Sequence, residues 1–133
     1  MDIHSEKVRS KNMAAIKSKN TKPEIEVRKH LYSLGFRYRL HSKSLPGKPD
    51  ISNISKKIAI FVNGCFWHSH KGCKYAFKPK TRADWWKKKL DSNKKRDQRN
   101  YLALKSMGWN VIVIWECEIK NKTYFEKINN FLL

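Results

Sequence analysis

Apolar residues recur at helical spacing soon after a polar and basic N-terminal stretch. Val27, Leu31 and Leu34 stand at positions i, i+4 and i+7, so a helix would carry all three on its buried face. Thr21 is a suitable N-cap for this helix, and Gly35 is a suitable residue to end it. The pattern therefore predicts one amphipathic helix between these two residues.

Four further runs have the composition and spacing of β-strands. The first two are short and only partly apolar, and the last two are continuous apolar runs of the kind found in buried strands. A polar turn separates the second run from the third, and a hairpin centred near Lys56 would place Asp50 opposite Val62. The predicted strands are residues 36–40, 50–54, 57–62 and 109–115.

A long helix is predicted over residues 83–107, ended by Gly108. Its stripe at helical spacing contains two polar residues, Asn93 and Asp97, and buried polar side chains need partners. These two either make structural hydrogen bonds or line a site, and spacing alone leaves both readings open. A shorter amphipathic helix is expected near the C-terminus. The stripe of the long helix is Trp86, Leu90, Asn93, Asp97, Tyr101 and Leu104, and that of the short helix is Tyr124, Phe125, Ile128 and Leu132.

The end of the third strand run carries residues that a plain core strand does not need. Cys65, His70 and Cys73 form a Cys-x4-His-x2-Cys cluster, and Cys117 follows the last strand run. Three cysteines and one histidine make a closed tetrahedral set of the kind that structural Zn²⁺ prefers. Buried free thiols are the alternative, but a histidine at ligand spacing favours zinc. The odd number of cysteines argues against a disulfide framework.

Charge indicates the kind of partner. The 133 residues include 30 Lys and Arg against 11 Asp and Glu, for a formal net charge of +19. Such a positive field favours an acidic polymer, with nucleic acid first, and the spread of the cations along the chain argues against an anionic membrane. No apolar run approaches the length of a bilayer span, and the charged N-terminus does not resemble a signal peptide. We expect a single cytoplasmic domain over residues 1–133.

Residues 1–22 form a basic arm that contains two apolar side chains of interest. Met13 and Ile16 are three positions apart, so one helical turn would point both the same way. They either pack onto the body of the domain or form an apolar wedge that presses between base steps of DNA. The loop before the long helix adds Lys80 and Arg82, which suit backbone phosphates.

Two carboxylates are candidates for a site near the cysteine cluster. Glu24 follows the predicted N-cap by three residues and leans toward the buried side of its helix, so it either caps the helix or reaches a metal site. Asp50 follows a proline turn, where a lone carboxylate is usually a turn residue. The predicted hairpin would nevertheless bring Asp50 beside His68.

Five groups of residues occur in an order that matches one known family. They are Arg9-Ser10-x-Asn12-Met13-x-x-Ile16 with Thr21 and Glu24; Leu45-Pro46-Gly47-x-Pro49-Asp50; Phe61-x-x-Gly64-Cys65-Phe66-Trp67-His68-x-His70; Lys80-Thr81-Arg82 with Trp86, Asn93, Arg96 and Asp97; and Gly108-Trp109 through Trp115-Glu116-Cys117. Together they resemble the very-short-patch repair (Vsr) family of DNA mismatch endonucleases over nearly the whole chain. The combination is far more specific than any single motif.

The resemblance implies an α/β, restriction-endonuclease-like fold of the PD-(D/E)xK type, with a mixed central sheet flanked by helices and a structural zinc site. It also implies Mg²⁺-dependent nicking of one strand of double-stranded DNA beside a T:G mismatch. We expect a monomer, with mismatch-repair proteins as candidate partners. Phosphodiester hydrolysis suits such a protein, because a divalent cation stabilises charge on the phosphate and a histidine moves protons near neutral pH.

By matching position, the resemblance also implies residue roles. Asp50 would hold Mg²⁺ together with the main-chain carbonyl of Val62. His68 would be the general acid or base, assisted by Glu24 and Asp97. The remaining roles fall on Cys65, His70, Cys73 and Cys117 as zinc ligands, on Phe66, Trp67 and Trp86 as side chains inserted beside the mismatch from the major groove, and on Met13 and Ile16 as a minor-groove wedge.

Two positions depart from the family pattern. Asn63 stands where the family commonly has a second histidine, and Val62 replaces a threonine found in some members. The change at Val62 preserves the carbonyl ligand, whereas Asn63 implies a lower rate or a proton transfer carried wholly by His68. Two other functions stay open, namely a Vsr-like restriction nuclease that cleaves paired DNA and a non-catalytic, zinc-stabilised DNA-binding module.

Overall fold

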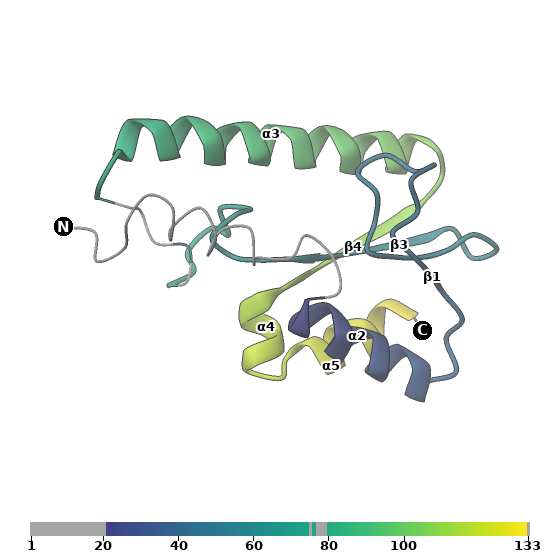
Figure 1. Cartoon of the computed structure of the whole chain (residues 1–133). Coiled ribbons are helices and arrows are strands. Elements are labelled where there is room, and N and C mark those ends of the chain that lie inside the picture. The colour runs from purple at the N-terminus through teal and green to yellow at the C-terminus, as the bar shows by residue number, and fades with distance from the viewer. Residues whose placement is uncertain (1–20, 75, 77–79, 133) are drawn as a thin grey trace.

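The computed structural model describes residues 21–74, 76 and 80–132, which form three layers (Figure 1). The long helix α3 lies over one face of a four-stranded sheet, and α2, α4 and α5 lie on the other face. This confirms the predicted mixed α/β sheet flanked by helices. None of the described helices is long and apolar enough to cross a membrane. The elements are α2 (Lys22–Ser33), β1 (Arg39–Leu40), β2 (Ile51–Asn53), β3 (Ile58–Asn63), α3 (Ala83–Ser106), β4 (Asn110–Trp115), α4 (Glu116–Lys120) and α5 (Tyr124–Leu132).

The sheet is mixed, because its strands lie in the order β1-β2-β3-β4 with two antiparallel pairs and one parallel pair. A parallel pair needs a crossover connection, and α3 supplies it between β3 and β4. The register pairs Ile58 with Asn110 and Asn63 with Trp115, so both strands end at the same edge of the sheet. The segments that follow β3 and β4 therefore begin side by side, although the whole of α3 separates them in sequence.

The hairpin of β2 and β3 differs from its predicted register by one residue. Ile51 pairs with Ile60, which places Asp50 across from Phe61 rather than from Val62. The cause is a turn closed by a hydrogen bond from the N–H of Lys57 to the carbonyl of Ile54 at 3.2 Å, which centres the hairpin between Ser55 and Lys56 and not on Lys56. The carboxylate of Asp50 nonetheless reaches the predicted neighbour, because it accepts a hydrogen bond from the N–H of Val62 at 2.7 Å.

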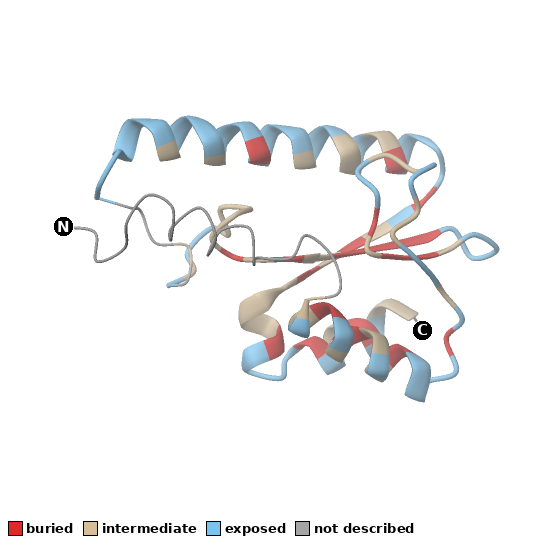
Figure 2. Cartoon of the chain, viewed as in Figure 1, coloured by how far each residue is buried: buried red, intermediate tan, exposed pale blue. Residues whose placement is uncertain are grey.

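Two apolar cores hold the layers together, one on each face of the sheet. The larger core packs α2, α4 and α5 against residues such as Ile60 and Ile114. Since successive strand residues point to opposite faces, the neighbours of Ile60 belong to the other core beneath α3. Figure 2 shows the buried strands between the layers and the exposed outer side of α3. The smaller core consists of Ala59, Phe61, Leu104 and Trp109.

Several element boundaries differ from the sequence prediction. Leu34 is 47% exposed and not buried as expected, because α2 ends at Ser33 and the chain turns away at this residue. The first predicted strand shortens to Arg39–Leu40. The short helix α4 was not predicted, and its N-terminus is stabilised by a bond from the N–H of Trp115 to the Glu118 side chain. The predicted stripe of α3 is confirmed, since all of its members are buried or half-buried.

The α3 core contact can be tested with two leucines of the same helix. Leu104 is 0% exposed and packs in the smaller core, whereas Leu102 is 67% exposed. We expect Leu104→Ala to lower the free energy of unfolding by about 2–5 kcal/mol because it leaves a cavity. Leu102→Ala should change it by less than about 0.5 kcal/mol. Urea unfolding followed by circular dichroism measures both, and equal effects would contradict the packing of α3.

Candidate active site and metal centre

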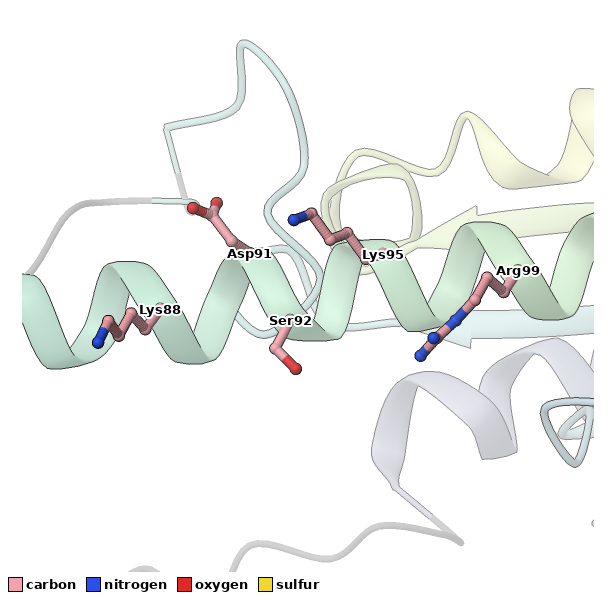
Figure 3. Close-up of a pocket in the computed structure, with 5 residues that line it drawn as sticks. All are labelled: Lys88, Asp91, Ser92, Lys95 and Arg99. Carbon is pink, nitrogen blue, oxygen red and sulfur yellow. The ribbon is translucent and has the colours of Figure 1, made fainter.

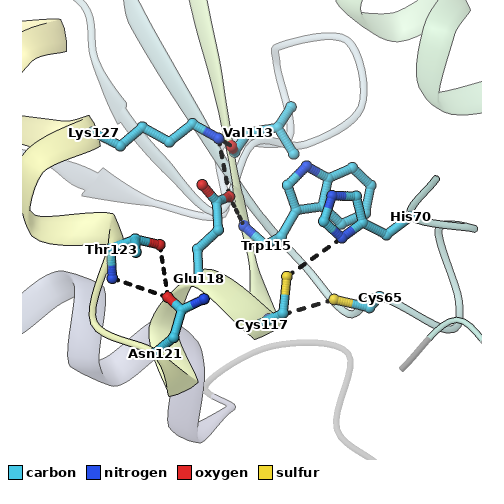
Figure 4. Close-up of polar contacts among 9 residues, drawn as sticks. All are labelled: Cys65, His70, Val113, Trp115, Cys117, Glu118, Asn121, Thr123 and Lys127. Atoms are coloured by element: carbon cyan, nitrogen blue, oxygen red, sulfur yellow. Dashed lines mark hydrogen bonds and ion pairs between the residues drawn. The ribbon is translucent and has the colours of Figure 1, made fainter. Parts of the chain in front are cut away.

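Four ligand-type side chains meet at the edge where β3 and β4 end. Cys65, His70 and Cys73 lie in the loop after β3, and Cys117 lies in α4 directly after β4. Their ligand atoms all lie within 4.8 Å of one another, as a group that could hold a metal ion. The N–H of Cys117 donates to Cys65 Sγ at 3.4 Å, and Cys117 Sγ lies 3.4 Å from His70 Nδ1 (Figure 4). The fold therefore assembles the cluster that the spacing predicted.

The electrostatics of this cluster suit a soft cation. Burial raises the pKa of Cys65 to about 12 and also raises the pKa of Cys117. Burial lowers the pKa of His70, which favours the neutral imidazole that a metal ligand requires. Because burial disfavours the negatively charged thiolate, a bound cation is needed to stabilise the thiolate form of these cysteines. Three sulfurs and one nitrogen fit tetrahedral Zn²⁺ and do not fit Mg²⁺, which prefers oxygen ligands.

Ring stacking and an ion pair hold the cluster against the sheet. Trp115 stacks on His70, with ring centroids 4.1 Å apart and an interplanar angle of 6°. Glu118 Oε1 accepts from the Trp115 N–H at 2.8 Å and from Lys127 Nζ at 2.9 Å. Lys127 also donates to the carbonyl of Val113 at 2.6 Å (Figure 4). Helix α5 thereby fixes the start of α4, where the last cysteine lies.

Helix α3 reaches the loop after β3 from the other face of the sheet. Asn93 Nδ2 donates to the carbonyl of Trp67 at 3.2 Å, and Asp97 Oδ2 lies 2.5 Å from His68 Nδ1. The two α3 residues are four positions apart and so share one helix face. Asn93 therefore makes a structural hydrogen bond, whereas Asp97 orients a candidate catalytic histidine. Because a carboxylate accepts, Nδ1 of His68 is the donor in this hydrogen bond, and Nε2 is the other ring nitrogen.

A second group of ligand atoms gathers beside the start of α2. One atom each from Glu24, His41 and Asp50 lies within 4.8 Å of the others. Glu24 is 1% exposed, and its carboxylate contacts Arg28 and lies 3.0 Å from His41 Nε2. Thr21 caps α2 as predicted, by accepting from the Glu24 N–H at 3.3 Å. The backbone of Glu24 thus takes part in the helix cap, while its side chain points toward His41 and Asp50.

Backbone contacts hold Asp50 from two directions. The N–H of Val62 donates to its carboxylate, and its own carbonyl accepts from the N–H of His41 at 3.1 Å. The preceding turn lies close to α3, since a Cβ added at Gly47 would lie 2.9 Å from Cβ of Asn100. Burial raises the pKa of Asp50 from 3.8 to about 6, although the hydrogen bond from Val62 acts in the opposite direction. A nearby cation would favour the charged carboxylate.

Tyr101 lies near both groups of candidate catalytic residues. Asn63 Nδ2 donates to its hydroxyl at 2.8 Å. Burial raises the pKa of Tyr101 to about 12, and the negative charges of Asp97 and Asp50 raise it further. Both carboxylates therefore act electrostatically on the same phenol. Within the described residues, Asp50 bonds to Val62 and His68 bonds to Asp97, and the expected proximity of Asp50 to His68 stays a prediction.

The aromatic residues implied to contact the mismatch form one cluster. Phe66, Trp67 and Trp86 lie with their ring centroids 5.2–5.7 Å apart in each pair. Trp85 extends this cluster toward solvent, being 47% exposed with its ring centroid 4.9 Å from that of Trp86. The guanidinium of Arg82 lies over the Trp85 ring at 5.0 Å. The loop after β3 and the start of α3 thus present a shared aromatic surface.

The exposed side of α3 carries an open, basic hollow of about 420 Å³ (Figure 3). None of the candidate ligands or catalytic residues lines it. Its cations suit a polyanion more than a small neutral substrate, because the hollow is open and has few apolar walls. We therefore assign it to the charged surface and not to the reaction centre. Its lining residues are Lys88, Asp91, Ser92, Lys95 and Arg99.

Of the remaining predicted DNA contacts, two lie in the described part of the chain and two do not. Lys80 and Arg82 are exposed just before α3, in a position compatible with phosphate contacts. Met13 and Ile16 lie outside the described residues, together with residues 1–20 of the basic arm. The apolar wedge therefore stays a prediction.

Three residues of the site were missed by sequence reasoning. His41 follows β1, and extending the register of β1 and β2 by one residue places it opposite Asp50. The pairing of β1 with β2 is the signal that locates His41, and the apolar pattern of the first strand does not contain it. Arg28 lies one turn after Glu24, the spacing of a helical ion pair. Trp85 was not singled out, because only its neighbour Trp86 fitted the predicted buried stripe of α3.

Comparisons with known proteins identify the family of this chain. The family model for the DNA mismatch endonuclease Vsr matches residues 1–74. The type II nicking enzyme V.XorIIP of Xanthomonas oryzae pv. oryzae is 47% identical over 121 residues, which cover 90% of this chain and 88% of that protein. The DNA mismatch endonuclease Vsr of Escherichia coli is 39% identical over 122 residues, which cover 91% of this chain and 77% of that protein. The chain therefore belongs to the Vsr family of DNA mismatch endonucleases and is an endonuclease that acts on DNA.

Proposed function

We propose that this endonuclease nicks one strand of duplex DNA beside a T:G mismatch in a reaction that requires Mg²⁺. The observation that carries the proposal is the placement of two reactive groups around Tyr101, namely the carboxylates at Asp50 and the His68–Asp97 pair. A cation site and a proton-transfer site are the two parts that phosphodiester hydrolysis needs. Nicking is favoured over cleavage of both strands because close relatives are named nicking enzymes.

Asp50 is the proposed ligand of Mg²⁺, together with the main-chain carbonyl of Val62. Carboxylate and carbonyl oxygens fit this hard cation, which when bound supplies Lewis-acid stabilisation of the phosphate. The hydrogen bond from the Val62 N–H fixes the orientation of the Asp50 carboxylate. Glu24, buried beside it and held by Arg28, adds a second negative charge at the same place.

His68 is the proposed general acid or base. Asp97 holds the imidazole through Nδ1, which leaves Nε2 to take a proton from water or to give one to the leaving oxygen. Asn63 donates its amide to Tyr101 in the place where the family commonly has a histidine. An amide does not titrate, so proton transfer in this chain falls on His68.

The aromatic cluster and the basic segments are the proposed DNA-binding surface. A mismatched step costs less to unstack than a paired one, so Phe66, Trp67 and Trp86 can favour the mismatch by stacking. Met13 and Ile16 would press from the minor groove, within an arm formed by residues 1–22. Exposed cations such as Lys80 and Arg82 would contact phosphates and make the affinity salt-dependent.

The cysteine and histidine cluster is the proposed structural zinc site, because its donor set and closeness fit Zn²⁺. We propose further that the chain is one restriction-endonuclease-like domain that acts as a monomer. The single mixed sheet with one apolar core on each face supports the proposal of one domain.

A nicking assay tests the function directly. An end-labelled duplex with one T:G mismatch in varied flanking sequence is compared with the fully paired duplex, with and without Mg²⁺. We expect Mg²⁺-dependent nicking of one strand at the mismatch. Asp50→Ala and His68→Ala should each lower the rate by about a hundredfold or more. His30→Ala is the matched control, because His30 contacts Asn129 outside the site.

Two outcomes would contradict the proposed function. Cleavage of both strands of the paired duplex would identify a restriction nuclease. Binding of every duplex without cleavage, also in the presence of Mg²⁺, would identify a DNA-binding module that has lost the reaction.

The raised pKa of Asp50 predicts that its charged carboxylate lowers the free energy of unfolding. The native state binds the Asp50 proton more tightly than the unfolded chain, so stability falls as pH rises from about 4 to about 6 and stays lower above that range. In zinc-loaded protein without Mg²⁺, Asp50→Asn should therefore be more stable than the wild type at pH 7.5. The rise from 3.8 to about 6 sets an upper limit of roughly 3 kcal/mol.

Urea unfolding at pH 7.5 and pH 4 measures this effect. The advantage of Asp50→Asn should shrink at pH 4, where the native carboxyl is already neutral. Asp91→Asn serves as the control, because Asp91 is exposed on α3. A variant that is less stable than the wild type at both pH values would show that the Asp50 carboxylate is not under strain from burial.

A further inference from the structure

His41 is the member of the carboxylate group that has no role in the proposed reaction. It comes from the loop after β1, whereas Glu24 comes from α2 and Asp50 precedes β2. Its ring Nε2 lies 3.0 Å from Glu24 Oε1 and 3.1 Å from Oε2. Its backbone N–H also donates to the carbonyl of Asp50. His41 is therefore tied to both carboxylate residues, through its ring and through its main chain.

The spacing of these atoms suits two ligands of one cation. With metal–ligand bonds of about 2.1 Å, neighbouring ligands of an octahedral ion lie about 3.0 Å apart. The Nε2 to Oε1 separation has this value, and an atom of Asp50 completes a group within 4.8 Å. Arg28 contacts the other oxygen, Oε2, while His41 Nε2 lies almost equally far from both oxygens of this carboxylate. The His41 side chain is 22% exposed, against 2% for Glu24, and so gives the group an opening to solvent.

We propose that His41 is a nitrogen ligand of the divalent cation at Asp50, and that Glu24 Oε1 is an oxygen ligand beside it. This inference deepens the proposed function, on which it rests, by naming the donor set of the cation site. An imidazole ligand favours transition metals over Mg²⁺. The site therefore binds Mn²⁺ more tightly than Mg²⁺, while the cysteine cluster keeps its preference for softer ions.

Electron spin-echo envelope modulation of bound Mn²⁺ tests the ligand directly. Full-length, zinc-loaded protein with a stoichiometric amount of Mn²⁺ should show coupling to a directly bound ¹⁴N nucleus. His41→Gln should lose this coupling and bind Mn²⁺ about tenfold more weakly in an electron paramagnetic resonance titration. His30→Gln and His68→Gln should retain the coupling, because neither histidine belongs to this group.

Absence of ¹⁴N coupling in the wild type, or its persistence in His41→Gln, would overturn the inference. Loss of all Mn²⁺ binding in Asp50→Ala, with the circular dichroism spectrum of the folded protein retained, would support the placement of the ion. The nicking assay separates the two proposals. Mismatch nicking with Mg²⁺ but no ¹⁴N coupling would rule out His41 as a ligand and leave the proposed function standing. ¹⁴N coupling without nicking on any duplex would rule out the proposed function and leave the metal site standing.

Discussion

The parallel pairing of β3 with β4 is the constraint on which the site depends. Parallel strands end at the same edge of a sheet, so the loop after β3 and the start of α4 begin as neighbours. Cys65 and Cys117 occupy those two segments and meet there. The same pairing requires a crossover, and α3 returns over the sheet as that connection. This return brings Asn93 and Asp97 onto the loop, where they hold Trp67 and His68.

The site places polar groups where the fold would otherwise bury apolar ones. Glu24 and Asn93 are almost fully buried, and Asp50 has a raised pKa because of its burial. Each is held by named partners, since Arg28 and His41 contact Glu24 and the N–H of Val62 reaches Asp50. The strongly positive chain around them attracts polyanions, while the carboxylates give that surface a local place for a cation.

The elements with strong local signals were predictable from the sequence. The continuous apolar runs of β3 and β4, the stripe of α3 and the Cys-x4-His-x2-Cys spacing all depend on local order, and the structure contains each of them. Features that depend on tertiary contacts were harder to predict from the sequence. The predicted hairpin register was wrong by one residue, because the turn between the strands, and not the apolar pattern, decides the register. Leu34 was wrongly assigned to the core, because the helix ends one residue before it.

The candidate site shows the same division. The resemblance to the Vsr family named Asp50, His68 and Asp97, and the structure joins His68 to Asp97. His41 carries no motif of its own, and its place beside Glu24 follows only from the pairing of β1 with β2. Local spacing is therefore sufficient to find ligands within one loop. Ligands contributed by separate segments depend on strand register, which a single sequence specifies weakly.

The proposed zinc site joins the two strand ends that position His68, so its ligand shell is the most direct test of this account. Zinc K-edge X-ray absorption of the purified full-length protein measures that shell. We predict one zinc per chain, with three sulfur ligands at about 2.3 Å and one nitrogen ligand at about 2.0 Å. Substoichiometric zinc, or a shell of oxygen and nitrogen without sulfur, would contradict the proposal that Cys65, His70, Cys73 and Cys117 bind one ion.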